Sequence, residues 1–145
     1  LSRGLGDVYK RQLITRELLQ DRVQVLSGPF LGDRCKPELK NMTPRSPGIL
    51  ARAGIPTAII TDHPETPIQY LPLCAALAVR EGMDREQALE AITITPARIC
   101  GLDKRVGSIK EGKDADFVVY QGDPLDLMNK PEMVICGGKI VYERK

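Results

Sequence analysis

Asp62 and His63 are the residues whose types and positions are best suited to chemistry. His63 is the only histidine of the chain, and the pair comes shortly after the apolar run Ala58-Ile59-Ile60. A carboxylate at the end of a short buried strand is held rigidly, which suits a group that moves protons in catalysis. One histidine is too few for most metal hydrolase sites, which combine several ligands. The sequence therefore points to a reaction that this chain is expected to serve only in part.

The segments that must position Asp62 alternate between helix and strand. Their apolar spacing and their Gly and Pro boundaries predict helix at 13–20, strand at 23–26, helix at 47–53 and strand at 57–61. Strands that alternate with helices imply a parallel sheet, so the first part of the chain is predicted to be α/β.

The segment after Asp62 predicts further helices. Thr66 has the type and place of an N-cap, with Pro67 at the first helical position, before a nearly all-apolar helix that Gly82 ends. Asp84 and Gln87 then have the spacing of a capping box, which starts another helix.

The character of the sequence changes near Gly101, where β-rich runs and turns replace helices. Residues 117–120 predict a strand, and 133–136 with 139–142 predict a hairpin across Gly137-Gly138. We therefore place a domain boundary near Gly101.

The composition is that of a globular protein and excludes two classes of partner. The 145 residues are 42% hydrophobic and 28% charged, and no apolar run approaches the roughly 20 residues of a membrane span. Aromatic residues are scarce at 4%, and the net charge is only +2, so neither nucleic acid nor a membrane is an expected partner. The four cysteines form no CxxC pair, which predicts buried reduced thiols and a cytoplasmic location.

Residues 1–12 are expected to be a non-native tail. Their sequence, LSRGLGDVYKRQ, is similar to adapter read-through in assembled metagenomic fragments, and three basic residues against one aspartate give it the whole +2 charge. We exclude this tail from the fold prediction.

Residues 32–47 are polar and rich in proline, and they predict a long loop. Loops of this length are often functional, so Asn41 and Arg45 are candidates for substrate contact. The alternative for both residues is a solvated surface position.

Several motifs together resemble the metal-dependent amidohydrolase superfamily, in particular its imidazolonepropionase-like members. The end of the 57–61 strand with Asp62-His63-Pro64 is similar to the end of the eighth barrel strand of that family. Residues 91–98 (AITITPAR) resemble the helix that leads into its tail, and residues 106–119 (VGSIKEGKDADFVV) resemble its return into a small β-sandwich domain. The resemblance extends from about residue 13 to the C-terminus.

The resemblance implies a (β/α)8 barrel with a metal site at the carboxyl ends of its strands. Residues 13–100 would be the last two strand–helix units of that barrel, and 101–145 a segment of the β-sandwich domain. The implied metal is zinc, and the implied substrate is a small cyclic or linear amide whose non-peptide carbon–nitrogen bond is hydrolysed. Family members bind the metal through histidines of earlier strands and one aspartate of the eighth strand, and only that aspartate is matched here, by Asp62.

The resemblance assigns Asp62 two roles, metal ligand and catalytic proton carrier, whereas the residues alone also allow it to cap the next helical turn. His63 either contacts the substrate or the metal, or orients Asp62 and fastens its loop. Neighbouring residues on a strand point to opposite faces, so the two are not expected to face the same metal.

Two functional classes stay open from the sequence. The first is an incomplete and inactive piece of an amidohydrolase, which would expose unpaired strand edges and so form homo-oligomers. The second is a non-catalytic interaction or structural module derived from the end of the barrel.

Overall fold

Two parallel strands form the centre of the N-terminal part. The structure is a computed structural model that describes residues 14–32 and 37–145. Strand β1 (Val25–Ser27) pairs in parallel with β2 (Thr57–Ile59), with Val25 opposite Thr57 and Ser27 opposite Ile59. The predicted parallel sheet is confirmed. Strand β1 begins two residues later than the predicted strand 23–26, and β2 ends two residues earlier than the predicted strand 57–61.

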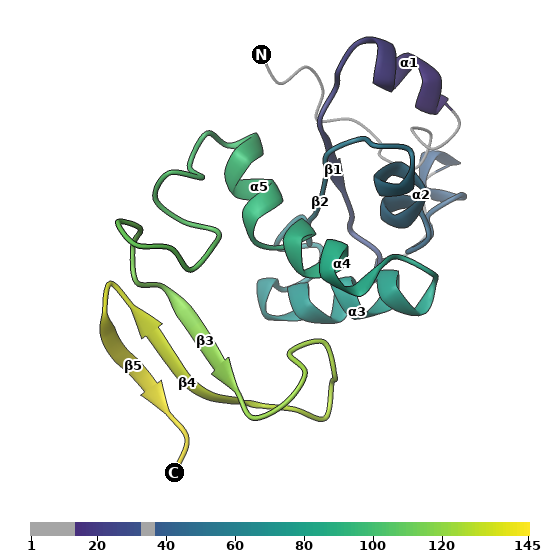
Figure 1. Ribbon diagram of the computed structural model, residues 1–145. Coiled ribbons are helices and arrows are strands. Elements are labelled where there is room, and N and C mark those ends of the chain that lie inside the picture. Colours follow the sequence, from purple (N-terminus) through teal and green to yellow (C-terminus); the bar gives the residue numbers. More distant parts are fainter. Residues whose placement is uncertain (1–13, 33–36) are drawn as a thin grey trace.

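Five α-helices and two short 3-10 helices surround this pair in the described part of the chain (Figure 1). The helices are α1 (Thr15–Gln20), η2 (Pro37–Leu39), α2 (Ser46–Arg52), η3 (Ile68–Tyr70), α3 (Leu71–Arg80), α4 (Arg85–Ala91) and α5 (Ile94–Ile99). The α/β order that the sequence predicts is therefore present as far as α5.

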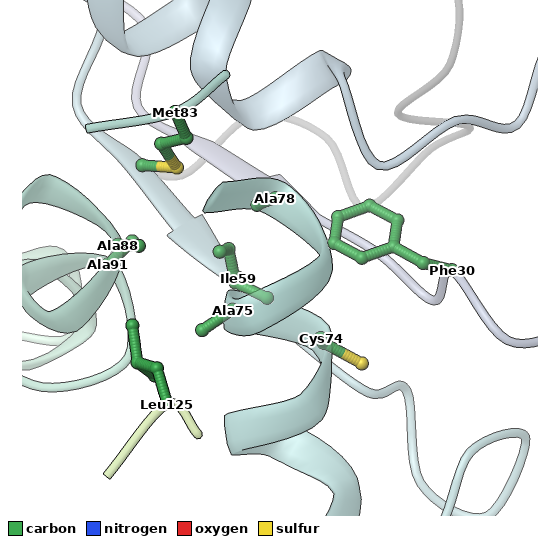
Figure 2. Packing of buried hydrophobic residues seen from close by; sticks show 9 residues of the cluster. All are labelled: Phe30, Ile59, Cys74, Ala75, Ala78, Met83, Ala88, Ala91 and Leu125. Atoms are coloured by element: carbon green, nitrogen blue, oxygen red, sulfur yellow. The ribbon is translucent and has the colours of Figure 1, made fainter. Parts of the chain in front are cut away.

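The main core lies between β2, α3 and α4, with the loop after β1 closing one side (Figure 2). Small side chains of α3 and α4 let these helices lie close to each other and to Ile59. The buried members are Phe30, Ile59, Cys74, Ala75, Ala78, Met83, Ala88, Ala91 and Leu125. A second cluster, Leu18, Val25, Leu50 and Ile55, fastens α1 and α2 to β1. Burial of a side chain such as Leu50 contributes about 1.5–3 kcal/mol.

The helix starts show which capping predictions hold. Asp84 is the N-cap of α4, and its Oδ1 accepts the Gln87 N–H at 3.0 Å, so the predicted cap is confirmed. The predicted Thr66 cap is wrong. Pro67 is extended and precedes η3, and the Thr66 side chain is buried instead of bonding to a helix start.

The C-terminal part is a three-stranded antiparallel sheet in the order β3 (Phe117–Tyr120), β4 (Pro131–Cys136) and β5 (Lys139–Glu143). Gly137 and Gly138 both have positive φ in the connection of β4 and β5, so the predicted hairpin is confirmed. The register of β4 and β5 shifts at Val134/Ile135, which leaves Val141 as an extra residue of β5.

Three contacts connect the sheet segment to the helices. Leu125, between β3 and β4, is buried in the main core, and the Arg85 guanidinium of α4 pairs with the Asp123 carboxylate. Gly107 lies against α5, where an added Cβ would be 2.7 Å from the Ala97 Cβ. These contacts join the segments on the two sides of Gly101. The domain boundary placed near Gly101 stays a prediction.

The three described cysteines differ from the prediction of uniformly buried thiols, and Cys35 lies outside the described residues. Cys74 is buried and free, whereas Cys100 and Cys136 are free and exposed, so the prediction is wrong for the latter two. Burial raises the pKa of the Cys74 thiol, and the Phe30 backbone N–H opposes this by bonding to the sulfur. Within residues 14–32 and 37–145, no helix is long and apolar enough to cross a membrane.

Asp123→Asn tests the joint between α4 and the sheet segment. Hydrogen bonds from Arg85 and from the Leu125 backbone hold the pKa of the Asp123 carboxyl below its ordinary value. A carboxylate with a lower pKa in the folded state stabilises above its unfolded pKa, and this contribution is lost as the pH falls through the folded value. We expect wild type to unfold at higher urea than Asp123→Asn at pH 7, and the difference to shrink below about pH 4.

The control is Asp126→Asn, because the Asp126 carboxylate accepts the Met128 N–H in the same loop without pairing with Arg85. A midpoint difference that is equal at pH 7 and pH 3 would contradict the role of the Asp123 charge.

Candidate functional site

Asp62 lies just beyond the carboxyl end of β2. The two strands stay connected past the last paired residues, because the Ile60 N–H donates to the Ser27 carbonyl at 2.9 Å. Asp62 follows two residues later, is exposed, and has a φ of +53°. A left-handed backbone is uncommon for a residue with a side chain, although Asp and Asn adopt it more readily than most.

A tight turn holds Asp62 and His63 at its tip. The Glu65 N–H donates to the Asp62 carbonyl at 2.9 Å, the Thr66 N–H donates to the Thr61 carbonyl at 3.2 Å, and the His63–Pro64 peptide bond is cis. Thr66 is only 2% exposed, so the far end of the turn is anchored in the protein interior. The two candidate side chains are therefore exposed to solvent on a short turn that two backbone hydrogen bonds close.

The structure excludes one alternative for Asp62. The N-cap positions of η3 and α3 are Pro67 and Tyr70, and neither helix start has a side-chain cap. Asp62 thus does not cap the following helical turn. Its exposed carboxylate is available for another role, and the catalytic role stays a prediction.

Arg45 and Asn41 are not brought to Asp62 by any described contact. The Arg45 Nε donates to Glu81 Oε2 at 2.9 Å, and this bond, followed by the charges of Arg45 and Arg80, lowers the pKa of the Glu81 carboxyl. Glu81 follows the C-terminal end of α3, whereas Asp62 precedes its start, and ten helical residues span about 15 Å. Asn41 is exposed. A substrate contact by either residue stays a prediction.

The described residues do not form a metal centre by themselves. In residues 14–32 and 37–145, no group of three or more His, Cys, Asp or Glu side chains is placed to hold a metal ion. Asp62 and His63 are adjacent on one turn, which is two potential donors where a zinc site needs three or four. Zinc binding at Asp62 would require ligands that these residues do not supply.

Two residues shape the site in ways that the sequence does not predict. The sequence predicts that Gly28 stops a strand and begins a loop that is a candidate for lining the substrate pocket, whereas in the structure it packs directly against the carbonyl of Ile60. Thr66 was interpreted as a cap, yet it anchors the turn from inside. The pair Gly28-Pro29 was the available signal, because a glycine next to a strand end often marks a close backbone approach.

A solvent-exposed carboxylate at the carboxyl ends of parallel strands is the placement expected of an active-site group in an α/β protein. Comparison with known proteins agrees with this class. The sequence matches the model described as "Amidohydrolase family" over residues 13–142. The chain therefore belongs to the amidohydrolase family, and the resemblance inferred from the sequence is confirmed.

Curated relatives match only part of their own length. Amidohydrolase tasK of Hapsidospora irregularis is 33% identical over 101 residues, which are 70% of this chain and 10% of that protein. Imidazolonepropionase of Geobacillus kaustophilus is 39% identical over 101 residues, covering 63% of this chain and 24% of that protein. The chain thus spans a quarter or less of these two relatives.

Solved structures show the same relation. An amidohydrolase from Thermotoga maritima matches with a TM-score of 0.89 and 38% identity over 94% of this chain and 36% of its own. An adenosine deaminase from Xanthomonas campestris with bound zinc matches with a TM-score of 0.62 over 91% of this chain and 35% of its own. At 22% identity the latter match shows a shared fold alone.

Substitutions at Asp62 separate its side-chain chemistry from its backbone conformation. Asn tolerates the left-handed region as Asp does, whereas for Ala this conformation costs about 1–2 kcal/mol. We expect Asp62→Asn to leave the free energy of unfolding within about 0.5 kcal/mol of wild type. Asp62→Ala is expected to lower it by about 1 kcal/mol in urea titrations. Glu65→Ala, at an exposed position of the same turn without positive φ, is the control, and equal stability of all three variants would refute the expectation.

Proposed function

We propose that this chain provides the last part of the active site of a metal-dependent amidohydrolase, with Asp62 as its catalytic carboxylate. In this proposal residues 13–100 are the final two strand–helix units of a (β/α)8 barrel, and residues 101–145 belong to its β-sandwich domain. The parent enzyme hydrolyses a non-peptide carbon–nitrogen bond of a small cyclic or linear amide.

The observation that carries the proposal is the position of Asp62 in a chain that belongs to this family. The carboxylate is exposed where the parallel strands end, and two hydrogen bonds of the surrounding turn hold its backbone. Barrel enzymes place their catalytic groups at this end of the strands, so Asp62 has the location that the reaction needs.

A carboxylate in this position suits proton transfer in amide hydrolysis. Asp62 would accept a proton from the water that adds to the carbonyl carbon, and would give it to the nitrogen as the carbon–nitrogen bond breaks. The carboxylate is restored at the end, so one water is consumed and an acid and an amine are formed. His63, next on the same turn, is proposed to orient Asp62 or fasten this loop.

Zinc is the proposed cofactor of the parent enzyme, and the remaining ligands must come from residues outside the described chain. The single histidine of the sequence and the lack of a ligand cluster in the described part both favour this division. We propose the class of substrate from the names of the relatives, which include an imidazolonepropionase and an adenine deaminase.

The chain alone is expected to be inactive and to bind zinc weakly. The measurements are isothermal titration with zinc and hydrolysis assays against small lactams, imidazolones and N-acyl amino acids. Zinc binding in the nanomolar range, or hydrolysis by the 145-residue chain, would overturn the division of ligands proposed above.

A chimera tests the catalytic role directly. The matching 36% of the Thermotoga maritima amidohydrolase is replaced by residues 14–145 of this chain, so that the relative supplies the rest of the proposed barrel. We expect zinc-dependent hydrolysis of at least one amide of the panel, and a loss of about 10²–10⁴-fold in kcat with Asp62→Asn.

Arg144→Gln is the matched control, because Arg144 forms a surface ion pair with Glu132 on the C-terminal sheet and has no role in the candidate site. It is expected to leave kcat within a factor of about two, as surface pairs contribute little. A folded chimera without activity, or one whose activity survives Asp62→Asn, would favour the non-catalytic module instead.

A further inference from the structure

Gly28 makes a close backbone approach to the segment that leads to Asp62. It follows the last residue of β1, has a φ of +148°, and faces the Ile60 peptide just after β2. A Cβ added at position 28 would overlap the Ile60 carbonyl oxygen and lie 2.9 Å from the carbonyl carbon. No side chain fits there unless the Ile60 peptide moves.

The Ile60 peptide is hydrogen-bonded to β1 shortly before the turn that carries Asp62. Its N–H is bonded to the Ser27 carbonyl, and its carbonyl is the group that Gly28 contacts. Two residues later the backbone reaches Asp62 in its left-handed conformation, and the Thr66 N–H closes the turn on the Thr61 carbonyl. Because only Thr61 lies between Ile60 and Asp62, a shift of the Ile60 carbonyl also displaces the Asp62 backbone.

We infer that Gly28 is a positioning residue for Asp62: the close contact of Gly28 with the Ile60 carbonyl sets where the catalytic carboxylate lies. This inference rests on the proposed function of Asp62. Displacement of a catalytic group by about 1 Å can lower a rate about 10²-fold, so this contact bears directly on activity.

Other glycines of the chain separate this contact from the need for positive φ. Gly54, after α2, has a φ of +81° and would have no atom within 4 Å of an added Cβ, so Gly54→Ala imposes backbone strain without a clash. Gly107, with a φ of +87°, would place its Cβ 2.7 Å from the Ala97 Cβ, so Gly107→Ala imposes strain and a clash against α5. Of these three substitutions, only Gly28→Ala combines backbone strain with a clash against the Ile60 carbonyl.

The first experiment compares these three alanine variants of the full chain by nuclear magnetic resonance. We expect Gly28→Ala to shift the amide resonances of residues 60–65 and the carboxyl carbon of Asp62. Gly54→Ala and Gly107→Ala are expected to leave these signals unchanged and to perturb only their own surroundings. Equal perturbation of the Asp62 carboxyl carbon by all three variants would overturn the inference.

The second experiment uses kinetics in the chimera, whose additional strands keep the test available even if Gly28→Ala destabilises the isolated chain. Gly28→Ala is expected to lower kcat about 10²-fold with KM within a factor of about two. In an Asp62→Asn background the same substitution is expected to cause no further loss. A change in KM alone, or an equal loss in the Asp62→Asn background, would overturn the inference.

The two experiments distinguish failure of the inference from failure of the proposed function. An inactive chimera together with a Gly28-dependent shift at Asp62 refutes the catalytic role and leaves the positioning contact established. An active, Asp62-dependent chimera that is indifferent to Gly28→Ala refutes the positioning role and leaves the catalytic role in place.

Discussion

The parallel pairing of β1 with β2 is the constraint on which the rest of the structure depends. It begins with the Val25 N–H on the Pro56 carbonyl at 2.9 Å and ends with the Ile60 N–H on the Ser27 carbonyl at the same distance. The pair buries Ile59 against α3 and α4, and it buries Val25 against α1 and α2. The turn that carries Asp62 begins where this pairing ends, so the core and the candidate site share one short ladder.

Short-range signals in the sequence predicted most of the elements. The order of helices and strands, the Asp84 cap and the Gly137-Gly138 hairpin each depend on residues within a few positions of one another, and all three are confirmed. Asp62 could be chosen as the candidate carboxylate for the same reason, since it directly follows an apolar strand.

The remainder depends on contacts between distant segments. Arg85 and Asp123 are 38 positions apart, and nothing in either local sequence indicates their pairing. The Thr66 prediction failed because its surroundings in the core, and not its helix propensity, decide where its side chain lies. The approach of Gly28 to Ile60 likewise follows from strand register, which the sequence alone does not determine.

The register shift in β5 has a consequence for assembly. Lys139 and Tyr142 oppose Cys136 and Val134 on one face of the sheet, while Ile140 and Glu143 oppose Ile135 and Met133 on the other. In a regular strand without the register shift, Lys139, Val141 and Glu143 would share one face, and two antiparallel β5 edges would bring Lys139 of one copy beside Glu143 of the next. The shift places these charges on opposite faces, so an antiparallel approach of two β5 edges does not pair Lys139 of one copy with Glu143 of the next on a common face.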